Sequence, residues 1–301
     1  MKFVSAGWKL QIVEVREAQF GEMRLAEQVE AYRDRMWRRE PELRVENAFM
    51  AEQFINDVGF CGALTDVRRP GPSLYIAVCG RRDAHMPRNV QRDPESSLTW
   101  NIKDEVMMKG RVYYGKLVKG RATFVARRLI PHFSALWGIP REQEPLALSG
   151  DALKVLALLR EEWEMASSDL RKASGIADRV RFNKALNELQ SRFKIVPAQV
   201  LYEPTFTYIW SILEGRFSEE MKVSVSREKS LCEIARAYLR GAGMTVRGEL
   251  ARVTGLSRPD AGLGYWALVD EGSAVRLGAG VYCLEEFSSG ISSSLAMGAS
   301  F

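Results

Sequence analysis

The C-terminal half of the chain repeats its own hydrophobic pattern at a distance of eighty residues, and no other feature constrains the fold as strongly. The shift places Leu159 over Leu239, Leu170 over Leu250 and Gly175 over Gly255. The other matched pairs are Val155 with Ala235, Ile176 with Leu256, Leu186 with Trp266 and Leu189 with Val269. Identities are few, so the repeat is one of pattern, and a pattern kept at a fixed spacing indicates two copies of one supersecondary unit.

Each copy has the apolar spacing of three helices followed by β-prone sequence. The helices are expected at residues 150–163, 167–174 and 177–193, and again at 229–240, 246–254 and 258–271. Gly175 and Gly255 stand at the tight turn before the third helix, where a positive φ is needed, and Ser257 is a candidate helix cap. A turn signal then divides two strand-like runs, as in a hairpin, so each copy has the layout of a winged helix-turn-helix. Two unrelated helical segments with chance spacing are the alternative.

The N-terminal part shows no such repeat. The residues KLQIVEV suggest a short strand, and helices are expected at Glu22–Arg39, Glu46–Val58 and Thr123–Trp137, the last bent at Pro131. Residues 80–99, which are charged and carry two prolines, are expected to form a long loop. The predicted fold is mainly α with small β-hairpin wings, and its tandem winged helix-turn-helix domains follow an α-rich N-terminal domain. Its expected parts are residues 1–140, 146–216, 226–288 and a flexible tail at 289–301.

The composition excludes several classes of protein. With 46% hydrophobic and 27% charged residues the chain is typical of a globular protein, and its apolar runs are too short for a membrane helix. The N-terminus lacks the apolar run of a secretory signal. Four cysteines form no CxxC pair and the two histidines are isolated, so neither a metal site nor a cofactor is expected. The cysteines are interpreted as buried hydrophobes in a reducing cytoplasm.

The positive charge is concentrated in one fifth of the chain. Residues 66–128 contain fourteen Lys or Arg against six Asp or Glu, although the net charge of the whole chain is only +5. Within this region, residues 109–128 (KGRVYYGKLVKGRATFVARR) carry seven cations, no carboxylate, and two adjacent tyrosines. Such a strip suits a nucleic acid, because cations neutralise phosphates and aromatic rings stack on exposed bases. The candidates are Lys103, Lys109, Arg111, Tyr113, Tyr114, Lys116, Lys119, Arg121, Arg127 and Arg128. In the alternative interpretation both tyrosines pack in the core and the lysines are solvated.

The third helix of the first copy is a candidate recognition helix. If Phe182, Leu186, Leu189 and Phe193 face inward, polar side chains of the types that contact base edges and phosphates face outward. These are Arg179, Arg181, Asn183, Lys184, Asn187 and Gln190. The corresponding helix of the second copy has one arginine and three acidic residues, so we expect it to repel phosphate and to contact a protein partner or a second subunit of a homodimer.

The residues GRATFVARRLIPHFSALWG (120–138), followed by the two winged-helix copies, resemble the AlkZ-like family of tandem winged-helix DNA glycosylases. The resemblance covers about two thirds of the chain. It implies a fold of several winged helices and the excision of alkylated or crosslinked bases from DNA. The catalytic signature of the family is Gln, a hydrophobic residue, then Gln or Asp.

This chain does not reproduce that signature. Its only Gln-x-Asp triplet is Gln91-Arg92-Asp93, with arginine in the middle and within the charged loop, and Gln11-Ile12 is followed by Val13. Asp104 and Glu105 are alternative carboxylates that could stabilise positive charge on the sugar or activate water, or else pair with neighbouring lysines.

Together these features predict a cytoplasmic protein that binds duplex DNA through the strip at residues 103–128 and the first recognition helix. A DNA glycosylase that uses the same surface and a protein-interaction scaffold are the alternatives.

Overall fold

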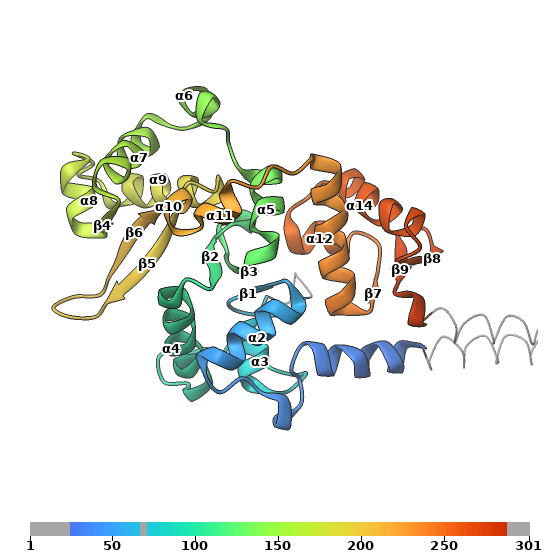
Figure 1. The fold of residues 1–301 in the computed structure, drawn as a ribbon. Helices are drawn as coiled ribbons and strands as arrows, with labels where there is room; N and C mark the ends of the chain where they lie inside the picture. Colours follow the sequence, from blue (N-terminus) through green and yellow to red (C-terminus); the bar gives the residue numbers. More distant parts are fainter. Residues whose placement is uncertain (1–24, 67–70, 288–301) are drawn as a thin grey trace, which may run out of the picture.

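The computed structural model describes residues 25–66 and 71–287 of the chain (Figure 1). The strand expected in KLQIVEV and the tail expected at 289–301 lie outside this part. Residues 25–36 are helical, as predicted, and the 3-10 turn η1 (Pro41–Leu43) follows.

One arrangement of elements occurs three times in the described chain. The first unit comprises α2 (Ala48–Val58), β1 (Phe60–Gly62), α3 (Leu74–Cys79), α4 (Pro94–Lys109), β2 (Val112–Lys116) and β3 (Ala122–Ala126). The middle unit comprises α7 (Gly150–Glu162), β4 (Glu164–Ala166), α8 (Ser167–Ala173), α9 (Arg179–Ser191), β5 (Ile195–Leu201) and β6 (Thr207–Ile212). The third unit comprises α12 (Arg227–Ala242), β7 (Met244–Thr245), α13 (Glu249–Thr254), α14 (Arg258–Asp270), β8 (Val275–Gly278) and β9 (Val281–Cys283).

All three units share one sheet topology. Their strand orders are β1-β3-β2, β4-β6-β5 and β7-β9-β8, with every neighbouring pair antiparallel. Three helices and a sheet whose last two strands form a hairpin have the element order of a winged helix-turn-helix. The fold is therefore mainly α with small β wings, and the N-terminal part contains a sheet of the same topology as the two repeated copies.

Short elements connect the units. Between the first and middle units lie η3 (Arg127–Leu129), α5 (Ile130–Trp137), η4 (Arg141–Gln143) and α6 (Glu144–Ala147). Between the middle and third units lie α10 (Leu213–Arg216) and α11 (Ser218–Met221), and η2 (Val118–Gly120) forms the turn between β2 and β3.

The repeat that the sequence predicts is present, but its spacing shortens by one residue in the third helix. The buried residues of α14 include Ala261, Tyr265 and Leu268, which correspond to Phe182, Leu186 and Leu189 of α9. Trp266, which the eighty-residue shift matched to Leu186, is exposed. Gly175 and Gly255 have φ values of 67° and 79° at the predicted turns, and Ser257 Oγ accepts a hydrogen bond from Asp260 N at 3.1 Å.

Two predictions for the N-terminal part were wrong. The helix expected at Thr123–Trp137 is a strand, β3, followed by α5, because β-branched and aromatic residues at 123–125 pair with β1 and β2. Pro131 lies in the first turn of α5 and bends no helix. The loop expected at 80–99 ends earlier, because Asp93 caps α4 by accepting a hydrogen bond from Ser96 N at 2.7 Å.

The first and third units share one hydrophobic core, to which the middle unit adds Phe193 and Val196, whereas the helices of the middle unit have a second core of their own. Phe54 and Val58 of α2 belong to the same cluster as Ile234 and Tyr238 of α12. In the middle unit, α7, α8 and α9 surround a separate cluster that includes Leu159. Figure 1 accordingly shows the middle unit as a lobe beside the other two, with the β5–β6 wing extending away from the body.

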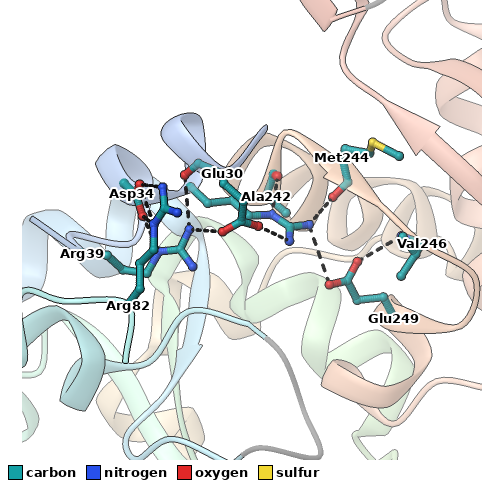
Figure 2. A network of polar contacts seen from close by, with 9 residues as sticks. Glu30, Asp34, Arg39, Arg82, Ala242, Met244, Val246 and Glu249 are labelled. Carbon is teal, nitrogen blue, oxygen red and sulfur yellow. Dashed lines mark hydrogen bonds and ion pairs between the residues drawn. The ribbon is translucent and has the colours of Figure 1, made fainter. Parts of the chain in front are cut away.

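An arginine of the N-terminal helix binds the third unit (Figure 2). Arg33 donates from Nε to Ala242 O at 3.0 Å and from Nη2 to Met244 O at 2.7 Å. The same Nη2 lies 3.8 Å from Glu249 Oε1. Arg33 therefore satisfies the carbonyl of the last residue of α12, which helix geometry leaves without a partner, and a carbonyl of β7.

The next residue in the N-terminal helix binds the first unit (Figure 2). Asp34 forms an ion pair with Arg39, with 2.9 Å between Oδ1 and Nε, and accepts from Arg82 Nε at 2.8 Å. Burial alone would raise the pKa of Asp34, but the hydrogen bonds and charges of Arg82 and Arg39 hold it below its ordinary value. The helix at 25–36 thus joins the first and third units.

Candidate nucleic-acid interface

The first two turns of α9 present polar side chains to solvent. Asp178 caps the helix by accepting from Val180 N at 2.7 Å. The four apolar residues predicted to face inward, Phe182, Leu186, Leu189 and Phe193, are all buried. Arg179, Asn183 and Lys184 are exposed, and within residues 25–66 and 71–287 neither cation has a carboxylate partner. In a helix-turn-helix, this N-terminal part of the third helix contacts base edges.

Two of the other predicted residues of α9, Arg181 and Gln190, have structural partners, and the third is partly buried. Arg181 pairs with Asp151 of α7, with 2.8 Å between Nη2 and Oδ2. Asn187 is half-buried. Gln190 is only 2% exposed, donates to Leu186 O at 3.2 Å, and accepts from Lys116 N at 3.0 Å. Gln190 therefore fastens α9 to the hairpin of the first unit and is not available to a base.

Exposed aromatic residues lie at the tip of the β5–β6 wing. Tyr202 and Phe206 are each 57% exposed, and Leu201 beside them is also exposed. The rings of Tyr202 and Phe206 lie 5.7 Å apart, and Phe206 lies 5.2 Å from Tyr208. These side chains flank Glu203 and Pro204, which form the turn signal of the first copy, and they were not among the residues expected to bind nucleic acid. The signal was present in the aromatic residues on both sides of the turn.

A buried lysine and aspartate of α4 anchor this wing. Lys103 Nζ lies 2.5 Å from Asp104 Oδ1 and donates to Tyr208 Oη at 2.9 Å, while Tyr202 Oη donates to Asp104 Oδ2. The ammonium lies 4.4 Å from the centre of the Trp100 ring. Two residues of the middle unit's wing are thereby bound to the third helix of the first unit.

Lys103 is 2% exposed and faces aromatic rings instead of solvent. Burial lowers the pKa of Lys103, although the neighbouring Asp104 favours its charged form. The phosphate contact suggested for Lys103 is incompatible with this position. Its closest partners are all supplied by α4 and the wing.

The strip at residues 109–128 is a hairpin, and both of its tyrosines pack against neighbouring rings. Tyr113 is fully buried and its ring lies 4.9 Å from that of Phe193. Tyr114 lies 4.9 Å from the Phe124 ring. Burial raises the pKa of both phenols. This arrangement corresponds to the alternative interpretation of the strip, in which the tyrosines belong to the core.

Most cations of the strip are paired. Arg121 lies 2.8 Å from Asp66, Lys109 lies 2.8 Å from Glu105, and Arg127 lies 2.5 Å from Glu220. Arg111 is 3.4 Å from the buried Glu52. Lys116 and Arg128 are exposed and have no ion pair within the described chain, whereas the Lys119 side chain lies outside it. The strip is therefore not a continuous basic surface.

The four candidate catalytic residues lie in different settings. Asp93 is the cap of α4, and Gln91 is exposed in the preceding turn. Glu105 is exposed and pairs with Lys109. Asp104 alone of the four is buried, and it lies directly beneath the wing.

Among the described residues no group of His, Cys, Asp and Glu side chains could hold a metal ion. In the same part of the chain, no helix is long and apolar enough to cross a membrane.

Comparisons with known proteins agree with this architecture. A family model described as AlkZ related matches residues 45–214. Among solved structures, the Streptomyces sahachiroi DNA glycosylase AlkZ is similar with a TM-score of 0.53 and 12% identity, covering 87% of this chain and 71% of that one. At this identity the likeness concerns the fold.

The DIP2311 protein from Corynebacterium diphtheriae also matches, at 16% identity over 70% of this chain and 38% of that one. Its TM-score is 0.20. The comparison with curated protein sequences finds no match.

Proposed function

This chain belongs to the AlkZ-related family, and we propose that it is a protein that binds duplex DNA through α9 and the β5–β6 wing. The observation that carries the proposal is the free polar face at the start of α9, where Arg179, Asn183 and Lys184 are exposed. Arginine and asparagine recognise guanine and adenine edges in the major groove, and lysine neutralises phosphate. The similar fold from Streptomyces sahachiroi is that of a DNA glycosylase, which favours the same class of partner.

The wing adds a second type of contact to this proposal. A hairpin that ends in Leu201, Tyr202 and Phe206 presents apolar and aromatic side chains that can wedge between bases or stack on them. The Lys103–Asp104 pair would hold the wing at a defined angle to α4 while it makes that contact.

Fluorescence anisotropy with duplex DNA across a salt series tests the proposal. We expect the double variant Arg179→Gln, Lys184→Gln to weaken binding and to reduce the slope of log K against log[salt] by about 1 to 2. A matched control is Lys154→Gln, Arg92→Gln, which removes two exposed cations that have no ion pair in the described chain and lie outside α9. Equal slopes for the two double variants would place the contact elsewhere, and absence of wild-type binding at low salt would refute DNA binding.

Excision of a damaged base is the second candidate function, and the position of Asp104 favours it. This carboxylate is buried, rigidly held, and close to an aromatic wing that can displace a base from the stack. Such a carboxylate could stabilise positive charge that develops on the sugar as the base leaves.

Release of base from alkylated duplex should then be lost in Asp104→Asn and retained in Glu105→Gln. Retained release in Asp104→Asn would exclude this residue. No release by the wild type would leave DNA binding as the function.

A protein partner remains a further proposal for the third unit. Leu263 and Trp266 of α14 are 58% and 45% exposed, so this helix carries apolar surface that a homodimer or another protein could cover. We also propose a cytoplasmic location, because the four free thiols suit a reducing compartment.

A further inference from the structure

Three acidic residues of the third unit have partners within the described chain. Asp260 pairs with Arg227 at 2.9 Å, and Glu271 pairs with Arg236. Glu249 is buried, where it approaches Arg33 and accepts from Val246 N at 3.0 Å. The phosphate repulsion expected from the sequence of α14 is therefore weaker than its composition suggests.

Three arginines lie at or near Gly248 in the same unit. A Cβ atom built on Gly248 would lie 3.6 Å from Arg258 Nε, so the Arg258 side chain passes over this glycine. Arg252 N donates to Gly248 O at 3.1 Å, which places Arg252 one helical turn further along the same side. Arg247 precedes Gly248 directly, and its Cγ lies 3.0 Å from where a Cβ of Gly280 would be, at the turn of the β8–β9 wing.

These three arginines are exposed and have no carboxylate partner within residues 25–66 and 71–287. A polyanion that binds these exposed cations releases its own condensed counterions, which favours the complex. Asp270, an acidic residue of α14 with no ion pair in the described chain, is at the other end of the helix from Arg258, about 18 Å away at 1.5 Å per residue.

The location of the cluster identifies its partner. It lies where the helix-turn-helix meets its wing. Arg247 precedes α13, Arg252 follows the first turn of α13, and Arg258 begins α14. Backbone phosphates of a duplex flank a recognition helix on these sides, and arginine is suited to phosphate because its guanidinium can donate two parallel hydrogen bonds.

We propose that Arg247, Arg252 and Arg258 form a second DNA-contact surface, which binds backbone phosphates without reading sequence. This inference rests on the proposed DNA-binding function and extends it to the third unit, which the sequence had assigned to protein contacts. In this arrangement the middle unit reads bases and the third unit adds affinity that depends on salt.

The test compares two triple variants that lower the net charge equally. Arg247→Gln, Arg252→Gln, Arg258→Gln removes the cluster, and Arg88→Gln, Arg92→Gln, Arg141→Gln removes three exposed arginines elsewhere that also lack ion pairs in the described chain. Anisotropy with one duplex across a salt series is measured for both and for the wild type. We expect the slope of log K against log[salt] to fall by about 2 to 3 in the cluster variant and by less than 1 in the control.

Each result has a defined meaning. Equal slopes in the two triple variants, with wild-type binding intact, would overturn the second surface and leave the proposed function standing. No binding by the wild type would overturn both. Polyglutamate serves as a second probe, because it is a polyanion without phosphate. If the cluster variant loses binding to polyglutamate but keeps the wild-type slope with DNA, the cluster serves an acidic protein surface, which also overturns the inference.

Thermal unfolding by circular dichroism should be the same for both triple variants, because none of the six side chains forms an ion pair within the described chain. Should the cluster variant fail to fold, the three single substitutions provide the test. Each should then lower the slope by about 1, and unchanged slopes in all three would overturn the inference.

Discussion

Removing one carboxylate should loosen the middle unit without affecting the other two. Glu144 of α6 is 3% exposed and accepts two hydrogen bonds from Arg160 of α7, at 2.7 and 2.8 Å. Lys194, which follows α9 and is 5% exposed, places Nζ 2.5 Å from Glu144 Oε1. One side chain of the linker therefore holds the first and third helices of the unit.

The cost of Glu144→Ala can be worked from these contacts. Breaking a buried ion pair by removing one partner costs about 3 to 5 kcal/mol, since the remaining charge stays desolvated. Arg160 is partly exposed, and Lys194 keeps a distant partner, Glu214, at 4.0 Å. Both facts place the expected loss near the lower limit, at about 3 kcal/mol.

Hydrogen exchange measures this loss locally. Because the middle unit has its own core, amides of α7 and α9 in Glu144→Ala should exchange on the order of a hundredfold faster, whereas amides of α12 should be unchanged. Glu142→Ala, on an exposed neighbour, is the control. A loss of exchange protection below about 1 kcal/mol in α7 and α9, or an equal loss in α12, would show that Glu144, Arg160 and Lys194 do not stabilise the middle unit in this way.

Three further predictions concern acid, the wing and the thiols. Burial would raise the carboxyl pKa of Glu144 and Asp34, but their arginine and lysine partners hold it below its ordinary value. The stability that they contribute is therefore present above about pH 4 and is lost as the pH falls through the lowered pKa. Acid unfolding followed by circular dichroism should detect this loss, and Glu144→Gln should make the pH dependence smaller. Tyr202→Phe removes the hydroxyl that donates to Asp104, so amides of β5 and β6 should lose about 1.5 to 3 kcal/mol of exchange protection; unchanged protection would show that the wing needs no such anchor. Burial raises the pKa of all four thiols, so iodoacetamide at neutral pH should label none of them in the native state and all of them in denaturant; rapid native labelling would contradict their burial. These thiols are Cys61, Cys79, Cys232 and Cys283.

Local chemistry allowed the repeated copies to be recognised from the sequence. The apolar spacing of α7, α9 and α12, the positive-φ glycines at 175 and 255, and the cap at Ser257 are each determined within a few residues. For the same reason the residues expected to face inward on α9 are the buried ones.

The first unit was not predicted from the sequence, because its sheet forms by pairing of strands that are far apart in the chain. β1 has three residues and pairs with β3, whose Val125 lies opposite Phe60. A strand so short has no periodicity of its own, and residues 80–93 separate the helices that would otherwise mark the repeat.

Which of the predicted binding residues are accessible also depended on contacts between residues far apart in the sequence. Charge and residue type placed Lys103, Tyr113 and Gln190 among the groups that contact nucleic acid, because the sequence indicates which side chains are cationic, aromatic or polar. It does not indicate what faces them. Asp104 and the wing surround Lys103, Phe193 covers Tyr113, and the hairpin of the first unit occupies Gln190. Residue types and local spacing determined the helices, caps and turns, whereas contacts between units decided which cations and aromatic rings remain free to bind.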